Sequence, residues 1–237
     1  MDIFNVLTMI GGVCLFLFGM SIMGEALEKR AGNSLKTILS RITGNKVTGA
    51  DIKTTALSDS ANCLHSAGFV GCVDTASTFT GCSVASTNIT MRGRTYYYAG
   101  FIGSTYSDTI ASTSAHGAVT VEKCFVQTTK LVTTNSRNCN EHAGLIGYLS
   151  EGSTVSDCYV TGFTGVANTN SLHVAGLIGY IPNVSGDATV VKNCLVKDIT
   201  LNGKNSLGEV IGNCVATNAT FKYLRYNNCS LNRVAGG

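Results

Sequence analysis

Cysteine and histidine are the residue types in this sequence best suited to metal binding, redox chemistry or nucleophilic catalysis. The chain has 10 cysteines and 4 histidines among 237 residues. A Cys-x-x-Cys pair, the usual element of a small zinc site, does not occur in the sequence. Cys63 lies two residues before His65, and Cys139 lies three residues before His142. His173 lies two residues before Ala175, which opens an Ala-Gly segment like those that follow His65 and His142. Imidazoles at strand edges are more often hydrogen-bonded than metal-bound, so the sequence predicts neither a metal site nor a cofactor.

Charged side chains are too few and too scattered to predict a catalytic centre. Residues 51–237 hold 11 acidic and 12 basic side chains, and no hydrolase, P-loop or dinucleotide-binding motif occurs. The triplet Tyr96-Tyr97-Tyr98 has the rings to stack on a sugar or a peptide, although an edge strand with mixed packing is the simpler interpretation. The chain is therefore predicted not to be an enzyme, and we assign it no catalytic or ligand-binding residue. A thinly spread net charge of +3 argues against nucleic acid as a partner.

Five of the ten cysteines are assigned to equivalent positions in an internal repeat. A first motif, Ala-Gly-[Phe/Leu]-[Ile/Val]-Gly, begins at residues 67, 99, 143 and 175, and a degenerate copy ends at Gly212. A second motif alternates with it and consists of an apolar residue, two spacers, cysteine, one spacer and an aliphatic residue. Its copies are Phe79–Val84, Val121–Val126, Val155–Val160 and Val191–Val196, with a weak one around Cys229 and Leu231. Two motifs in constant order, recurring every 32 to 44 residues, indicate stacked supersecondary units.

The period of both motifs favours strands. Cys158 and Val160 are two residues apart and would point to the same side of a strand, whereas Tyr159 would point to the other. Each unit alone leaves one face open, so neighbouring units must stack to bury a shared core. Residues 51–237 are therefore predicted to be an all-β domain, a parallel β-solenoid of about five repeats.

In this solenoid one cysteine per repeat should form an internal ladder. Neighbouring thiols would lie about 4.8 Å apart along it, whereas a disulfide places the Cβ atoms about 3.8 Å apart. The members are therefore expected to be small, buried, unpaired side chains. They are Cys82, Cys124, Cys158, Cys194 and Cys229.

The repeat also resembles a known family. The Ala-Gly-[Phe/Leu]-[Ile/Val]-Gly signature, followed by a strand such as Asp157–Gly162, is similar to the GLUG-type repeat of microbial surface proteins, over about residues 60–231. The resemblance implies a β-helical stalk or an adhesin-like region and carries no catalytic residues.

The first 50 residues have a different character. Residues 3–24 contain no charged side chain, and residues 3–23 would form a helix of roughly 32 Å, about the thickness of a bilayer core. We predict a transmembrane or signal-anchor helix at residues 1–24; a cleaved signal peptide and a buried core helix are the alternatives. Residues 25–50 are expected to form an amphipathic helical connector to the repeat domain at residues 51–237.

Residues 1–49 resemble a second family. The apolar start, Phe16-Leu17-Phe18-Gly19-Met20 and the following Gly-Glu-x-Leu-Glu-Lys-x-Ala-Gly segment are similar to the N-terminus of bacterial sodium/phosphate cotransporter-type proteins. That family carries a Gln-Ser-Ser-Ser transport motif, which does not occur in this sequence. The resemblance therefore implies membrane attachment rather than transport.

These observations lead to a membrane-tethered structural or adhesive module that binds glycan or protein at the cell surface. The alternatives are a glycan-active enzyme on a β-helix and a chimeric product joined near residue 50. Five Lys or Arg residues follow the predicted span before residue 50 and none precedes it, so the positive-inside rule argues for a cytoplasmic repeat domain. The family resemblance favours an extracellular one.

Overall fold

The computed structural model describes residues 46–54, 62–91, 94–107, 115–134, 139–167 and 171–233. The predicted membrane segment at residues 3–23 and most of the predicted connector lie outside these ranges. In the described ranges no helix has the length and hydrophobicity that crossing a bilayer requires. Asn45–Gly237 forms one compact unit.

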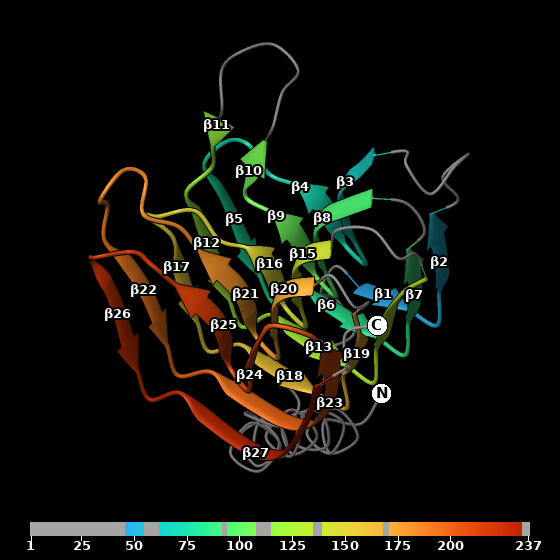
Figure 1. Ribbon diagram of the computed structural model, residues 1–237. Coiled ribbons are helices and arrows are strands. Elements are labelled where there is room, and N and C mark those ends of the chain that lie inside the picture. Colours follow the sequence, from blue (N-terminus) through green and yellow to red (C-terminus); the bar gives the residue numbers. More distant parts are fainter. Residues whose placement is uncertain are drawn as a thin grey trace, which may run out of the picture. The chain divides into compact units, whose positions relative to one another are not determined.

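These residues form a parallel β-solenoid, as predicted (Figure 1). In each coil the chain passes through two strand positions of sheet A and then one each of sheets B, C and D. Strands of successive coils pair in parallel, so each sheet is a ladder that runs along the solenoid.

Sheet A has ten strands in two adjoining stacks. The first stack contains β1 (Lys46–Thr48), β6 (Ser83–Ala85), β13 (Phe125–Gln127), β18 (Tyr159–Thr161) and the first halves of β23 (Leu195–Gly203) and β27 (Arg225–Arg233). The second contains β2 (Asp51–Thr54), β7 (Asn88–Met91), β14 (Lys130–Thr133), β19 (Thr164–Val166) and the second halves of β23 and β27.

Sheets B, C and D have five strands each. Sheet B consists of β3 (Asn62–Ala67), β8 (Arg94–Ala99), β15 (Cys139–Ala143), β20 (Ser171–Ala175) and β24 (Ser206–Gly208). Sheet C consists of β4 (Val70–Cys72), β9 (Ile102–Ser104), β16 (Ile146–Tyr148), β21 (Ile178–Ile181) and β25 (Ile211–Cys214). Sheet D consists of β5 (Ser77–Thr80), β12 (Val119–Glu122), β17 (Thr154–Ser156), β22 (Thr189–Lys192) and β26 (Ala219–Lys222). One short antiparallel pair, β10 (Tyr106–Ser107) and β11 (Ala115–His116), leaves this pattern between β9 and β12.

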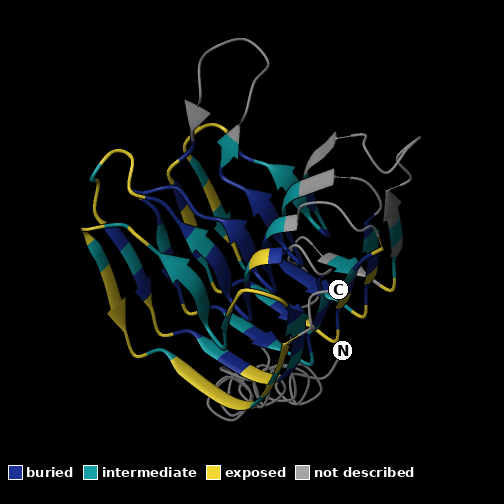
Figure 2. Cartoon of the chain, viewed as in Figure 1, coloured by how far each residue is buried: buried dark blue, intermediate teal, exposed yellow. Residues whose placement is uncertain are grey.

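The core runs through the centre of the coils (Figure 2). Each coil contributes aliphatic side chains in register, and the valines that end the second motif are all fully buried: Val84, Val126, Val160 and Val196. The stacked rings of Phe69 and Phe101, with centroids 4.9 Å apart, extend the same packing into the first coils.

The two glycines of the first motif are required by close backbone approach. A Cβ at Gly144 would meet the carbonyl oxygen of Gly176 in the next coil and the side chain of Val160. A Cβ at Gly147 would lie 2.5 Å from the carbonyl oxygen of Gly103 and 3.0 Å from the backbone of Tyr98. Only glycine lets sheet C pass this close to sheet B.

The cysteine ladder is confirmed at four positions and wrong at the fifth. Cys82, Cys124, Cys158 and Cys194 are buried, each directly before a strand of the first stack of sheet A. The pairing of Leu195 with Arg225 puts Leu224, not Cys229, beyond Cys194. Cys229 pairs with Ile199 and therefore belongs to the next corner of the coil.

The tyrosine triplet also differs from its prediction. Residues 96–98 lie in β8, which pairs with β3 on one side and β15 on the other, so this strand is central rather than an edge. Tyr98 is fully buried and Tyr97 is half-buried on the opposite side.

Candidate functional site: a strip of aromatic, histidine and glutamate side chains

The outer side of sheet B brings together residues that are far apart in the sequence. His65, Tyr97, Glu141 and His173 occupy one register position in β3, β8, β15 and β20. Their neighbours in the chain point inward, because side chains alternate along a strand. Tyr98, His142 and Val174 are accordingly fully buried.

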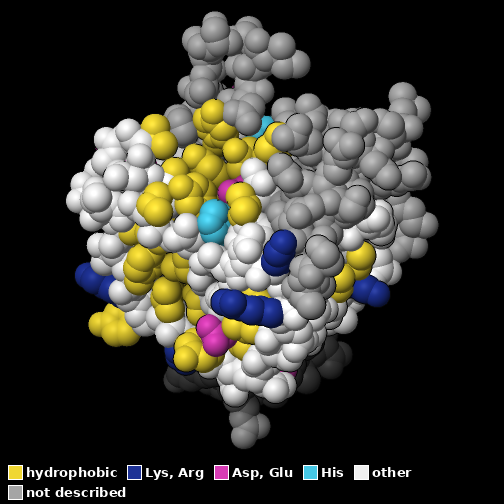
Figure 3. Space-filling model, viewed as in Figure 1, with side chains coloured by type: hydrophobic (Ala, Val, Ile, Leu, Met, Phe, Trp, Pro, Cys, Tyr) yellow, Lys and Arg dark blue, Asp and Glu magenta, His cyan; other side chains and the backbone are white. Residues whose placement is uncertain are grey.

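Sheet C adds aromatic rings beside this stack. Tyr148 and Tyr180 pair in register, and their ring centroids lie 5.6 Å apart. The ring of Tyr97 lies 5.0 Å from that of Tyr148, and the rings of His173 and Tyr180 are parallel within 10° at 4.9 Å. We call this set the aromatic strip: His65, Tyr97, Glu141, Tyr148, His173, Tyr180 and Asn213. On the face drawn in Figure 3, a histidine and an acidic side chain lie among hydrophobic ones.

Hydrogen bonds define the imidazole of His173. The Asn213 amide Nδ2 lies 3.1 Å from its Nε2, and the carboxylate Oε1 of Glu141 lies 3.4 Å from its Nδ1. An amide nitrogen only donates and a carboxylate only accepts, so the neutral imidazole carries its proton on Nδ1. The neutral imidazole of His173 therefore accepts a hydrogen bond from Asn213 and donates one to Glu141.

Glu141 is the acidic member of the strip. It is 5% exposed, and its second oxygen, Oε2, has no hydrogen-bond partner. Burial raises the pKa of Glu141, and the hydrogen bond and charge of His173 oppose this rise. Burial and the negative charge of Glu141 also raise the pKa of Tyr180. The strip thus contains a buried carboxylate oxygen without a hydrogen-bond partner, beside its aromatic rings.

His142, which the sequence grouped with Cys139, belongs to the core instead. Neither of its ring nitrogens has a hydrogen-bond partner, and its ring centroid lies 4.9 Å from that of Tyr98. Burial lowers the pKa of His142 to about 3, so the imidazole is neutral at physiological pH.

The structure does not bring Cys63 and Cys139 side by side. Both pair with Thr95, from opposite sides of β8, so one coil separates them. In the described ranges, no group of three or more His, Cys, Asp or Glu side chains is placed to hold a metal ion.

The four cysteines of the ladder are free thiols suited to packing. The thiol of Cys158 lies 3.2 Å from the carbonyl oxygen of Ser156, and Cys194 makes the same contact with Lys192. Burial raises the pKa of Cys124 to about 12, and a hydrogen bond to Cys194 together with burial raises the pKa of Cys158. Cys124 and Cys158 are therefore poor nucleophiles and poor metal ligands, whereas the hydrogen bond to Cys158 lowers the pKa of Cys194.

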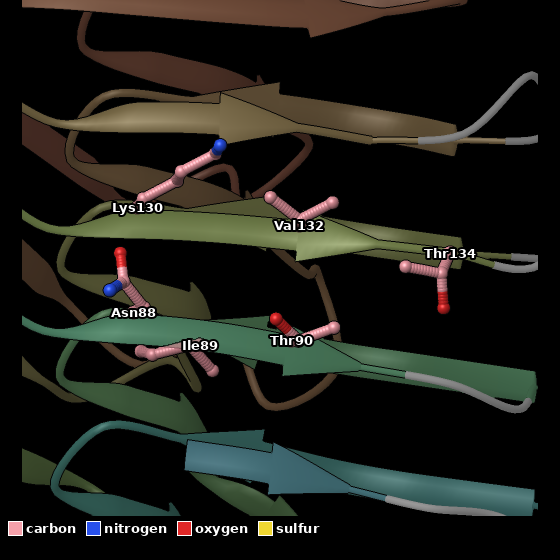
Figure 4. Close-up of a pocket in the computed structure, with 6 residues that line it drawn as sticks. All are labelled: Asn88, Ile89, Thr90, Lys130, Val132 and Thr134. Atoms are coloured by element: carbon pink, nitrogen blue, oxygen red, sulfur yellow. The ribbon is translucent and has the colours of Figure 1, made fainter. Parts of the chain in front are cut away.

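A shallow groove lies on the outer face of sheet A (Figure 4). It has a volume of about 380 Å³ and crosses β7 and β14. Its lining is mostly short and polar, with one cationic side chain: Asn88, Ile89, Thr90, Lys130, Val132 and Thr134. It contains none of the aromatic rings or carboxylates that distinguish the strip.

Glu151 lies between β16 and β17 and binds the backbone of the loop between β21 and β22. Its Oε2 accepts hydrogen bonds from the backbone nitrogens of Val184, Ser185 and Gly186 at 2.7, 2.5 and 3.0 Å. Burial of the carboxyl group opposes its ionisation, but these bonds prevail and lower the pKa of Glu151. The Oε2 of Glu151 therefore holds this loop in place, while its Oε1 is buried without a hydrogen-bond partner.

Sequence reasoning missed four members of the strip: Glu141, Tyr148, Tyr180 and Asn213. A signal for Glu141 exists, because His65, Tyr97, Glu141 and His173 all lie two residues before the alanine that opens the first motif. Tyr148, Tyr180 and Asn213 each directly follow the last glycine of a copy of that motif.

Comparisons with family models, with curated proteins and with solved structures give no match for this chain. The two family resemblances of the sequence therefore stay predictions.

Proposed function

We propose that the chain is a membrane-tethered, surface-displayed binding module, and that the aromatic strip is where it contacts an extended glycan. The observation that carries this proposal is the row of the half-buried Tyr97 and Tyr180 and the buried Tyr148, beside the buried, unpartnered Oε2 of Glu141. Rings supply flat apolar contacts for sugar faces, and a carboxylate oxygen accepts hydrogen bonds from hydroxyl groups.

The rigidity of the solenoid supports a binding role. Except for His65 on β3, the last strand of sheet B, each ring of the strip is held by backbone pairing on both sides, because β8, β16, β20 and β21 all lie inside their sheets. A surface fixed before binding loses little conformational entropy when a ligand docks.

Binding is better supported than glycan cleavage. Most glycoside hydrolases use two carboxyl groups on either side of the scissile bond. Among the described residues of the strip, Glu141 is the single carboxylate, and one of its oxygens already faces His173.

Affinity electrophoresis of the full chain in detergent, through gels containing mannan, xylan, hydroxyethyl cellulose or soluble chitin, tests the binding site. We expect at least one polysaccharide to retard the protein, and Tyr180→Leu and Glu141→Gln each to weaken binding about tenfold. The matched control is Tyr159→Leu, because Tyr159 also stacks on an aromatic neighbour, Phe125, but lies on sheet A. Equal losses in Tyr159→Leu and Tyr180→Leu, or retardation by no polysaccharide, would contradict the proposal.

Display at the cell surface is tested separately. Protease added to intact cells should digest residues 51–237 if they are extracellular, and the predicted span at residues 3–23 should keep the remainder in the membrane fraction. Full protection of residues 51–237 would exclude adhesion to external ligands, whatever the gels show.

A further inference from the structure

Glu141 lies among the rings of the aromatic strip. Within sheet B it pairs in register with Tyr97 on one side and with His173 on the other. On the side of sheet C, a Cβ built on Gly179 would lie 3.4 Å from the Cβ of Glu141. Gly179 directly precedes Tyr180 in the chain, so the missing side chain of this glycine leaves room for Glu141 next to Tyr180.

The charge of Glu141 has no permanent counter-charge. Its ion-pair partner at 3.4 Å is His173, an imidazole that is charged only when it is protonated. No lysine or arginine belongs to the aromatic strip. In the described part of the chain, the ion pairs of lysine side chains are with Glu122 and Asp198 instead. A buried carboxylate that lacks a counter-charge is costly, so a cation that comes close to it is favoured.

The rings of the strip favour a cation as well. The face of an aromatic ring carries negative partial charge and attracts a cation within about 6 Å of its centroid. The centroid of Tyr180 lies 5.6 Å from that of Tyr148 and 4.9 Å from that of His173. Burial and the negative charge of Glu141 raise the pKa of Tyr180, so the field of the carboxylate reaches the hydroxyl of this ring.

We propose that the glycan bound by the aromatic strip is cationic, a polysaccharide with free amino groups. This inference rests on the proposed function, because a sugar stacked on the rings is what would bring its ammonium group beside Glu141. Contact with the buried Oε2 is not required, since Coulomb attraction falls only with the inverse of the distance. The ammonium group in turn favours the ionised carboxylate, so binding and ionisation support each other.

The overall charge of the chain acts in the opposite direction. The chain has a net charge of +3, which repels a cationic ligand at long range. A preference for amino groups therefore cannot come from the molecule as a whole and must arise locally at the strip. This makes Glu141 the residue to change.

Two hexasaccharides that differ mainly in charge test the proposal. The β-1,4-linked hexamer of glucosamine and its fully N-acetylated counterpart share one backbone, but only the first carries ammonium groups. Each is labelled with the same neutral fluorophore, and anisotropy is measured with the full chain in detergent at about pH 6, below the pKa of an amine. We expect the glucosamine hexamer to bind about tenfold more tightly, and this ratio to fall as salt is added.

Three variants separate the charge from the rings. Glu141→Gln keeps the shape of the side chain and removes its charge, so the ratio of the two affinities should fall to about one. Asp157→Asn is the matched control, because it removes the same charge at a corner of sheet A and asparagine tolerates the left-handed backbone there (φ 55°). It should keep the wild-type ratio. Tyr180→Leu should weaken the binding of both sugars, with circular dichroism showing all three variants folded.

The other outcomes contradict the proposal in distinguishable ways. Equal binding of the two hexamers, or a tenfold ratio that survives Glu141→Gln, would overturn the cationic preference and leave glycan binding intact. Failure of both hexamers to bind would also overturn the preference, while the polysaccharide gels decide separately whether the strip binds another glycan. A lysine hexapeptide that competes as well as the glucosamine hexamer would assign the strip to a cationic protein segment.

Discussion

At the scale of single residues, His142 is the least expected side chain of the core. It occupies the inward position that Tyr98 and Val174 fill in the adjacent coils. A neutral imidazole there fills space, but its two nitrogens lie buried without hydrogen bonds. Such a group costs stability that an apolar side chain of similar volume would not.

The pH dependence of folding should reveal this residue. The unfolded chain protonates His142 below about pH 6.5, whereas the folded chain resists protonation down to about pH 3. The unfolded state therefore binds more protons between these values, and stability falls as pH falls. His142 alone should lower the free energy of unfolding by about 3 kcal/mol between pH 7 and pH 4.

Urea unfolding of His142→Leu at several pH values measures this contribution. We expect the variant to be more stable than the wild type at pH 5 and to depend less on pH. Val174→Leu, at the same position one coil later, controls for repacking and should keep the wild-type slope. An unchanged slope in His142→Leu would show that other groups cause the acid sensitivity.

Part of the aromatic strip could be predicted from the sequence, residue by residue. Alternation along a strand is enough to separate Tyr97 from Tyr98, and alignment of the repeats is enough to stack His65 with Tyr97. The ring of Tyr180 on His173 was not predictable, because it depends on how close sheet C lies to sheet B. The motif glycines allow that close approach, but the distance itself depends on contacts with the backbone of the neighbouring coils, such as that of Gly147 with Gly103 and Tyr98.

At the scale of elements, the corners of sheet A repeat one backbone conformation, a residue with positive φ. The residue before each inward corner side chain is left-handed, as in Lys123 (φ 54°) before Cys124 and Thr128 (φ 47°) before Thr129. Gly162 occupies the position of Thr128 in the next coil, with φ 63°. Non-glycine residues pay roughly 1–2 kcal/mol for this conformation, so several corners are strained.

Relieving one corner should stabilise the protein. Thr128→Gly removes left-handed strain from a β-branched residue, and we expect a net gain of about 0.5–1 kcal/mol after the added entropy of the unfolded chain. Thermal unfolding of the variant measures the gain. Thr129→Gly is the matched control and should destabilise, because Thr129 is buried and its hydroxyl donates to the Gln127 carbonyl oxygen at 3.1 Å. A loss of stability in Thr128→Gly would mean that its side chain contributes more than its strain costs.

The same corners explain the error over Cys229. Each coil has two inward corner positions in sheet A, and Leu224 and Cys229 fill them in the last coil. The ladder requires a small or medium apolar side chain, which leucine supplies as well as cysteine does. The cysteine in the last coil therefore lies at the other corner, as the pairing of β23 with β27 shows.

At the scale of the whole molecule, the glycine columns set the spacing of the coils. Gly103, Gly147, Gly179 and Gly212 each approach a carbonyl oxygen of a glycine in the preceding coil, or backbone of sheet B, closely enough to exclude a side chain. Because every coil contacts only its neighbours, a defect at one level must be absorbed by the levels beside it.

The loss of stability caused by a Gly→Ala substitution should depend on its position along the solenoid. Gly147→Ala lies between coils on both sides, whereas Gly212→Ala lies in the last complete one and would meet the Gly179 carbonyl oxygen at 2.6 Å. We expect the first substitution to cost at least about 2 kcal/mol and the second clearly less, because no described strand pairs with the other side of β25. Chemical denaturation of both variants compares them, and equal losses would imply that the whole array responds as one rigid unit.

The overall architecture was the most predictable feature. Two alternating motifs with a period of two residues are sufficient for a parallel solenoid, because neither motif can bury its apolar face alone. The division of each coil into five strand positions was not predictable, since it depends on corners at residues as ordinary as Ser86 and Lys123.

The antiparallel pair β10 and β11 has a practical consequence. It accounts for part of the longer spacing between Gly100 and Gly144, yet the flanking strands β9 and β12 keep their register with β16 and β17. The Gly117 nitrogen donates to the Thr105 carbonyl oxygen at 2.8 Å and closes the base of the excursion. A foreign epitope grafted between Ser107 and Ala115 would therefore be presented from the scaffold without changing the coils that carry it.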